Sequence, residues 1–189
     1  MIYVHRGMQL LLYCSIVVCY ECHAETRPLQ RYTAATNELA HAATQEEYFH
    51  ALDRVAKESF VVDRFDEARK SANELLSLAP RFINANAYGL AIHDGNMVLG
   101  RLALKEGHID ESRHYLLEAG KSPGSPTLDT FGPNMSLARD LLENGQSDVV
   151  LQYLELCRKF WQNDYGKLNE WEMDIKAGKT PSFGANLLY

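Results

Sequence analysis

The chain has 189 residues, of which 46% are hydrophobic and 23% charged, and its formal net charge is −6. This length predicts one soluble domain rather than two, with enough residues to bury a substantial core. The acidic balance argues against non-specific nucleic-acid binding, which needs a basic face.

The first 24 residues have the pattern of a secretory signal peptide. His5 and Arg6 precede an apolar run from Met8 to Tyr20, and Ala24 offers a small residue for cleavage. The run is shorter than the about 20 residues that a comfortable membrane span needs. We therefore predict cleavage after Ala24, export of the mature chain, and no stable membrane insertion afterwards. The alternatives are an uncleaved N-terminal anchor and a misassigned start.

Cysteine usage follows from that cleavage. Cys14, Cys19 and Cys22 fall in the leader, which leaves Cys157 alone in the mature chain. The core must therefore hold without an intramolecular disulfide. Each leader cysteine follows a bulky or charged residue, which argues against lipoprotein processing. Cys157 lies on an expected buried stripe, so we predict a small core residue rather than a reactive thiol.

The rest of the chain begins as a series of amphipathic helices. The Ala-rich stretch 31–43 predicts the first one. Thr44 and Glu47 have the spacing of a capping box, which opens a second helix. A third is expected at Phe65–Leu78 and is stopped by Pro80.

The segment Asn96–Ala119 predicts two short helices that pack as an αα-hairpin, broken at Gly107. Gly100 and Ala103 on the first helix would allow a close approach of the two backbones. The second helix carries an apolar stripe whose spacing fits a helix and not a strand. Its residues are Ile109, Ser112, Leu116 and Ala119.

Two other segments repeat this pattern, one starting at Val55 and one at Leu137. In all three, a small residue of the first helix precedes the first stripe residue of the second by twelve positions. The pairs are Ala56 with Ala68, Gly100 with Ser112, and Ala138 with Val150. Three units with one internal spacing predict a stacked repeat array.

The remaining segments predict connections and a cap. Residues 81–95 are a candidate backward extension of the central first helix. Residues 121–133 are rich in Pro, Gly and Ser and predict a loop. A last helix ending near Gly178 is expected to cover the apolar end of the array.

The stretch from Leu99 to Ala119 resembles a tetratricopeptide repeat, and the units at Val55 and Leu137 resemble weaker members of that family. The matching residues are Leu99-Gly100, Gly107, Asp110-Glu111-Ser112, Leu116, Ala119 and, closing the first unit, Pro80. The units depart from the pattern in having Asn96 and Asn134 where an aromatic is usual, and in being spaced more widely than about 34 residues.

The resemblance implies an all-α fold: a tetratricopeptide-like, right-handed stack of antiparallel helix pairs, an α-solenoid with a C-terminal capping helix. Residues 25–165 would hold the repeats, in units near 48–80, 94–120 and 132–158. Residues 166–189 would form the terminal helix and an apolar tail. A generic leader on a tetratricopeptide-like chain resembles the exported proteins of Gram-negative bacteria. The resemblance therefore favours a periplasmic location.

The resemblance also implies that the first helices line a concave surface that takes an extended peptide or a partner helix. Lys57, Arg101 and Arg139 recur at one position of this surface and could hold acidic side chains or a carboxylate terminus. Alternatively they are solvated charges that pair with nearby carboxylates. The expected partner-binding residues are Lys57, Asn96, Met97, Arg101, Leu104, Asn134, Met135, Arg139 and Leu142, with Phe60 on the same face.

A smaller pattern places a glycine shortly before Asn96, Asn134 and Asn186, each followed by an apolar residue. Asparagine accepts hydrogen bonds from helix-start amides, so a structural role at helix starts is one interpretation. The other is that Asn96 and Asn134 bind a peptide backbone in the groove. The third copy suggests that the C-terminal tail tucks back as a truncated first helix.

The favoured function is a non-catalytic module that binds a protein or peptide, with no cofactor. The alternative is an exported metal-dependent enzyme or metal-binding protein that uses His93 and Asp94, or His108, Asp110 and His114. The sequence contains no Gly-rich phosphate loop and no His-Glu-x-x-His motif.

Overall fold

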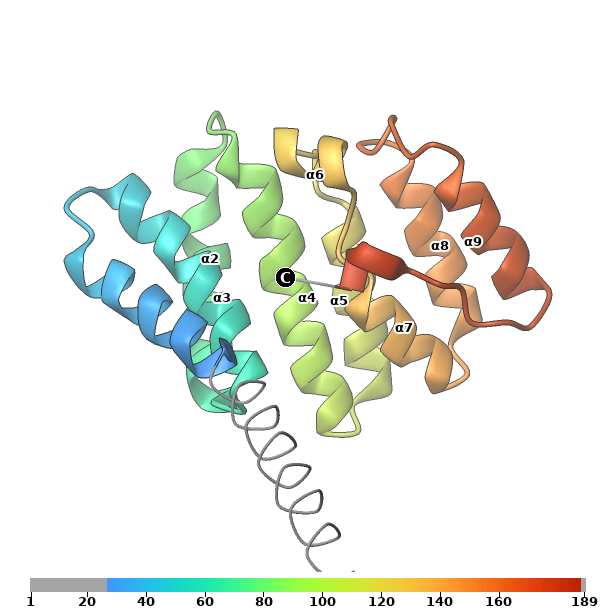
Figure 1. Cartoon of the computed structure of the whole chain (residues 1–189), viewed down its shortest axis with the longest axis horizontal. Coiled ribbons are helices and arrows are strands. Elements are labelled where there is room, and N and C mark those ends of the chain that lie inside the picture. Colours follow the sequence, from blue (N-terminus) through green and yellow to red (C-terminus); the bar gives the residue numbers. More distant parts are fainter. Residues whose placement is uncertain (1–26, 188–189) are drawn as a thin grey trace, which may run out of the picture.

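The computed structural model describes residues 27–187, which are helical and contain no strand (Figure 1). The expected all-α fold is therefore confirmed for this range. The signal-peptide prediction for residues 1–24, with Cys14, Cys19 and Cys22, lies outside the described residues. None of the helices in the described range is both long enough and apolar enough to span a membrane.

Residues 27–41 form the first helix of the described range. The further helices are α2 (Gln45–Val61), α3 (Phe65–Leu78), α4 (Ala87–Lys105), α5 (Ile109–Gly120), α6 (Pro126–Phe131), α7 (Ser136–Glu143), α8 (Ser147–Cys157) and α9 (Lys167–Lys176). Two 3₁₀ turns complete the list, η1 (Ala79–Phe82) and η2 (Gly184–Leu187).

The helices pack in consecutive pairs. α2 contacts α3, α4 contacts α5, and α7 contacts α8. Neighbouring pairs meet through α2 and α3 against α4, then through α4 against α7 and α5 against α8, and α9 packs on α8. Figure 1 shows these elements following one another along the long axis of the molecule in chain order. Each pair therefore buries its apolar face against its sequence neighbours.

The helix starts follow local signals. The Thr44 hydroxyl accepts from the Glu47 amide at 3.1 Å and the Glu47 carboxylate accepts from the Thr44 amide at 3.3 Å, which confirms the capping box of α2. α4 starts at Ala87, so the backward extension of the central first helix is also confirmed.

The loop expected at residues 121–133 is only partly a loop, because α6 forms within it. The Ser125 hydroxyl accepts from the Leu128 amide at 3.1 Å, and Pro126 occupies the first turn, where its missing N–H costs nothing. A Ser-Pro pair that we took as loop composition therefore starts a short helix.

Four helices end in the same turn. α2, α4, α7 and α9 are each followed by a residue with positive φ: Asp63 at 58°, Gly107 at 79°, Gly145 at 74° and Gly178 at 74°. In each case the next amide donates to the carbonyl five positions earlier, at 2.8–2.9 Å. This is the hydrogen bond of the Schellman motif, so one turn geometry recurs along the chain.

A seam of small residues sets how closely the pairs approach. Ala56, Gly100 and Ala138 are all buried, as are their partners twelve positions later. A Cβ added at Gly100 would lie 2.3 Å from Cδ2 of Leu137 and 3.0 Å from Cβ of Tyr115. Only glycine therefore lets α4 approach α5 and α7 this closely.

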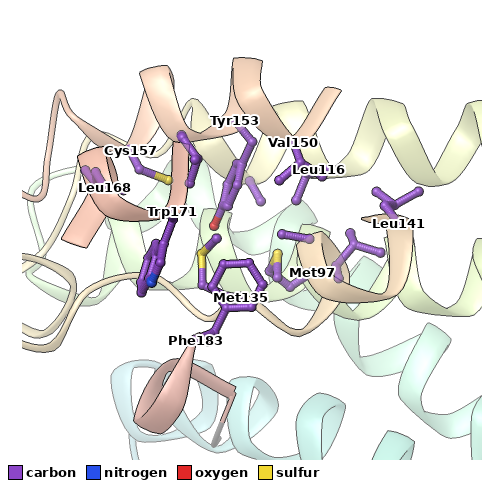
Figure 2. Packing of buried hydrophobic residues seen from close by; sticks show 14 of the residues in the cluster. Met97, Leu116, Met135, Leu141, Val150, Tyr153, Cys157, Leu168, Trp171 and Phe183 are labelled. Atoms are coloured by element: carbon purple, nitrogen blue, oxygen red, sulfur yellow. The ribbon is translucent and has the colours of Figure 1, made fainter. Parts of the chain in front are cut away.

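The largest hydrophobic cluster lies in the C-terminal half, where Met97, Met135 and Trp171 pack with Tyr153 (Figure 2). Cys157 belongs to the same cluster and is fully buried. Burial raises the pKa of its thiol, which keeps the sulfur protonated and unreactive at neutral pH. This fits the expectation of a core cysteine.

Replacing Asp63 with glycine should stabilise the protein. Asp63 is exposed and holds the left-handed conformation that glycine adopts at the three equivalent turns, so Asp63→Gly relieves backbone strain. We expect the free energy of unfolding to rise by about 1 kcal/mol in urea titrations. The reciprocal control, Gly107→Asp, should lower it, and a loss of stability in Asp63→Gly would contradict the assignment.

Candidate functional site

Two hollows lie on the side of α4 that faces α2 and α7. The distal groove has a volume of about 360 Å³ and is lined by Phe60, Arg101, Leu104, Lys105, Asp140, Glu143 and Asn144. The Lys57 cavity has a volume of about 180 Å³ and is lined by Lys57, Leu90, Asp94, Thr127, Leu128, Phe131, Gly132, Pro133, Asn134, Ala185 and Asn186. Asp94 and Arg101 are seven residues apart on α4, so the two hollows share one helix face.

In the distal groove two arginines share one carboxylate. Arg101 Nε lies 3.0 Å from one oxygen of Asp140, and Arg139 lies 3.1 Å from the other. The Arg101 guanidinium also stacks 4.4 Å above the ring centre of Phe60. The Arg139 Nε is buried without a hydrogen-bond partner, and Glu143 forms an ion pair with it at 3.7 Å. Asp140 and Glu143 therefore balance the charge of the two arginines, but leave this N–H without an acceptor.

The expected apolar floor is not at the surface. Met97 and Met135 are 0% exposed and belong to the core cluster, so no partner can touch them in this conformation. The helical period places Met97 on the inward side of α4, and Met135 lies just before the start of α7. Leu104 lines the groove, whereas Leu142 is partly buried against the core cluster.

The two asparagines have different roles. Asn134 Oδ1 accepts from the Ser136 amide at 2.8 Å, which is the expected structural role at the start of α7. Asn96 instead lies in the middle of α4 and its amide donates to the Ile92 carbonyl at 2.7 Å. It marks no helix start, because α4 begins nine residues earlier than the pattern implied.

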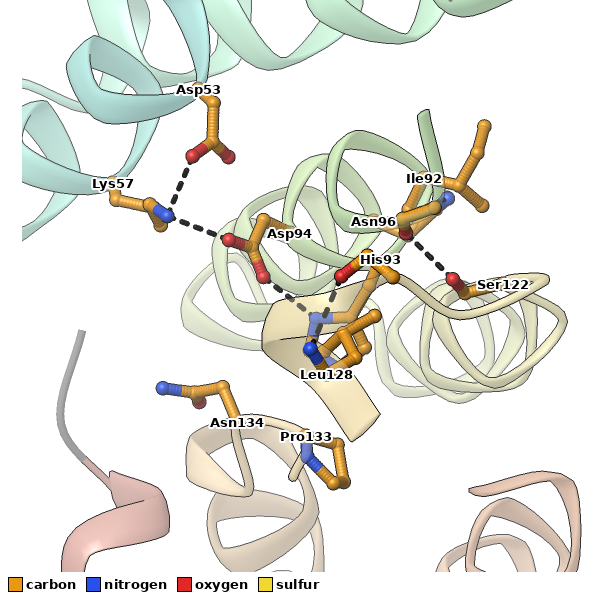
Figure 3. A network of polar contacts seen from close by, with 12 residues as sticks. Asp53, Lys57, Ile92, His93, Asp94, Asn96, Ser122, Leu128, Pro133 and Asn134 are labelled. Carbon is orange, nitrogen blue, oxygen red and sulfur yellow. Dashed lines mark hydrogen bonds and ion pairs between the residues drawn. The ribbon is translucent and has the colours of Figure 1, made fainter. Parts of the chain in front are cut away.

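Lys57 lies between two buried carboxylates (Figure 3). Its Nζ is 2.7 Å from Asp53 on the same helix and 2.6 Å from Asp94 on α4. Asp94 also contacts His93 Nδ1 at 2.7 Å, and His93 Nε2 lies 2.9 Å from the Tyr153 hydroxyl. This polar chain links α2, α4 and α8 through the interior.

The network continues beyond α8. The Tyr153 hydroxyl donates to the Asn134 carbonyl at 3.4 Å, which reaches the segment before α7. The sequence analysis singles out only His93 and Asp94 and assigns Lys57 to a binding surface. Asp53 and Lys57 are spaced i,i+4 on one helix, and their apolar neighbours in the sequence are the signal that could indicate a buried pair.

Burial and charge shift the pKa values of this cluster in opposite directions. Burial raises the pKa of Asp53 to about 7, because desolvation outweighs the attraction of Lys57. Burial alone would also raise the pKa of Asp94, but Lys57 and His93 hold it well below its usual range. For Lys57, burial opposes the charged form, yet Asp53 and Asp94 together raise its pKa above the ordinary value.

The C-terminal segment docks beside the Lys57 cavity. The side-chain amide of Asn186 donates to the carbonyls of Phe131 and Pro133 at 2.9 and 3.0 Å. The Asn186 carbonyl accepts from the Met135 amide at 2.7 Å. Phe183 is buried with its ring centre 5.0 Å from that of Trp171. The tail therefore tucks back, as a 3₁₀ turn against the start of α7.

The histidines proposed as metal ligands are not brought together. His93 lies within α4, whereas His108 lies in the turn after the C-terminal end of that helix. The side chains of His108 and His114 are 61% and 65% exposed. Their nearest carboxylates belong to Glu111 and Glu118 on the same helix, at 3.5 and 3.9 Å. Within residues 27–187 no three His, Cys, Asp or Glu side chains are grouped to hold a metal ion.

Comparison of the chain with protein-family models, with curated proteins and with solved structures gave no match.

The raised pKa of Asp53 predicts a pH dependence of stability. Because the folded protein holds the proton of Asp53 up to about pH 7 and the unfolded chain releases it near pH 4, ionising Asp53 destabilises the fold as pH rises between these values. Relative to Asp53→Asn, the native chain should lose up to about 1.4 kcal/mol per pH unit across this window. Urea titrations from pH 3 to 8 measure the difference.

Asp94→Asn provides the contrast for this measurement. The low pKa of Asp94 means that its ionised form stabilises the fold, so this variant should be most deficient at neutral pH and least deficient near pH 3. A difference between Asp53→Asn and the native chain that stays constant with pH would contradict the account.

Proposed function

We propose that the chain is a non-catalytic, exported binding protein that holds an extended segment of a protein or peptide partner along the face of α2, α4 and α7. In this proposal the helix pairs form a tetratricopeptide-like, right-handed solenoid with α9 as its cap. The shared spacing of twelve residues, the recurring turn and the contacts between successive pairs support that architecture. Export into a periplasm rests on residues 1–24.

The docked tail is the observation that carries the proposal. Asn186 bonds to the residues before α7, and Ala185 and Asn186 line the Lys57 cavity together with side chains of α2 and α4. The segment is held by backbone carbonyls and amides and by one asparagine side chain. A face that holds a short segment of its own chain through backbone groups in this way has the hydrogen-bonding groups to hold a segment of another protein.

The distal groove extends the same face beyond the tail. Arg101 and Arg139 share Asp140, and Arg139 also pairs with the exposed Glu143, so an acidic side chain or carboxylate terminus of the partner would find two guanidinium groups and an N–H of Arg139 that has no acceptor. Phe60 and Leu104 supply apolar contact area next to them. In this proposal the acidic group of the partner binds at Arg101 and Arg139 and not at Lys57.

Photocrosslinking in the producing cell tests this proposal. A photoreactive residue at Glu143, on the wall of the groove, should capture a specific protein, whereas the same residue at Glu170, exposed on α9, should not. The purified partner should then bind the chain, and Glu143→Trp should weaken binding at least tenfold because the indole fills the groove. Glu170→Trp should leave it unchanged.

Equal capture from both positions would contradict the proposal. So would a purified partner that binds Glu143→Trp as tightly as it binds the native chain. Thermal melting of both tryptophan variants controls for loss of fold, since both replaced glutamates are exposed.

A further inference from the structure

We propose that the Lys57 cavity binds a positively charged group on an apolar stem, an ammonium or guanidinium such as that of a lysine or arginine side chain. The inference deepens the proposed function and rests on it for the source of the group, a basic residue of the bound segment. The chemistry of the cavity itself is argued from its own residues.

The first argument is the balance of charge around Lys57. One ammonium lies within 2.7 Å of two carboxylates, those of Asp53 and Asp94, so with His93 neutral the cluster gains an excess negative charge whenever Asp53 ionises. Asp53 Oδ1 is buried and has no hydrogen-bond partner. Burial raises the pKa of Asp53 to about 7, which is the response of a carboxylate that lacks a sufficient counter-charge. A second cation in the cavity would favour the ionised form of Asp53 from beside Asp94, since Asp94 lines the cavity and Asp53 does not.

The second argument is what lines the cavity. Asp94, whose side chain is only 7% exposed, contributes the carboxylate, and Leu90 and Leu128 contribute apolar walls. Phe131 also lines the cavity and is 71% exposed, so its ring is available to a cation from solvent. Apolar walls, an accessible aromatic ring and a buried carboxylate are the features that a lysine or arginine side chain requires.

An anion fits this cavity poorly. Lys57 could offer one further N–H, but a bound carboxylate or phosphate would become the third negative group near Asp53 and Asp94. Figure 3 shows both carboxylates directed toward the Lys57 ammonium. Like charges in a buried cluster repel strongly because the surroundings screen them little.

The experiment titrates the purified chain with three probes: N-acetyl-lysine amide, its uncharged counterpart N-acetyl-norleucine amide, and N-acetyl-glutamate amide. Binding is followed by calorimetry and by the NMR shifts of the Phe131 and Asn134 amides, which border the cavity. The lysine probe should bind with shifts confined to the cavity, at least tenfold more tightly than either of the others.

Matched variants locate the effect. Asp94→Asn should weaken binding of the lysine probe at least tenfold, while Asp140→Asn, in the distal groove, should leave it unchanged. Phe131→Ala removes an exposed ring without touching the buried cluster and should weaken binding at least threefold, which keeps the test decisive even if Asp94→Asn unfolds.

Equal binding of the lysine and norleucine probes, or tighter binding of the glutamate probe, would overturn the inference. So would binding that neither Asp94→Asn nor Phe131→Ala weakens. If only this inference is wrong, crosslinking from position 143 still captures the partner. If the proposed function is wrong, that capture is lost while the lysine probe still binds in the cavity.

Discussion

One ammonium group lies between two buried carboxylates, and the structure of the face depends on this arrangement. Lys57 joins Asp53 on α2 to Asp94 on α4, and His93 and Tyr153 carry the chain of polar contacts to α8. Buried charges are expensive unless their partners are held in place. The cluster therefore fixes the position of α2 against α4, and it places charged groups beside a cavity that opens on the same face.

Two different charge arrangements follow one another along α4. At Asp94 one cation lies between two carboxylates, and at Arg101 two cations share Asp140, with Glu143 paired to Arg139. The two positions are seven residues apart, which is about 10 Å along a helix. An extended segment that carries a basic and an acidic residue at roughly that separation would complement both. Charge arranged in this way gives specificity for one partner more than raw affinity.

Local signals predicted most of the helices, because capping boxes, glycine turns and apolar stripes act over a few residues. Thr44, Gly107 and the twelve-residue spacing are examples, while α6 was missed because Ser125-Pro126 fits a loop as well as a helix start. The site was predicted less well. Lys57 and Asp94 are 37 residues apart in sequence and His93 and Tyr153 are 60 apart, so no local pattern links them.

A double-mutant cycle on Lys57→Met and Asp94→Leu tests the central claim most directly. Lys57→Met leaves two buried carboxylates without their cation and should lower the free energy of unfolding by about 3 kcal/mol at pH 7, whereas Asp94→Leu should cost less because Lys57 keeps Asp53. The double variant should lose less than the sum of the two, since the contact between Lys57 and Asp94 is then removed once and not twice. Losses that add to within about 0.5 kcal/mol would show that the two groups are not coupled and would contradict this account.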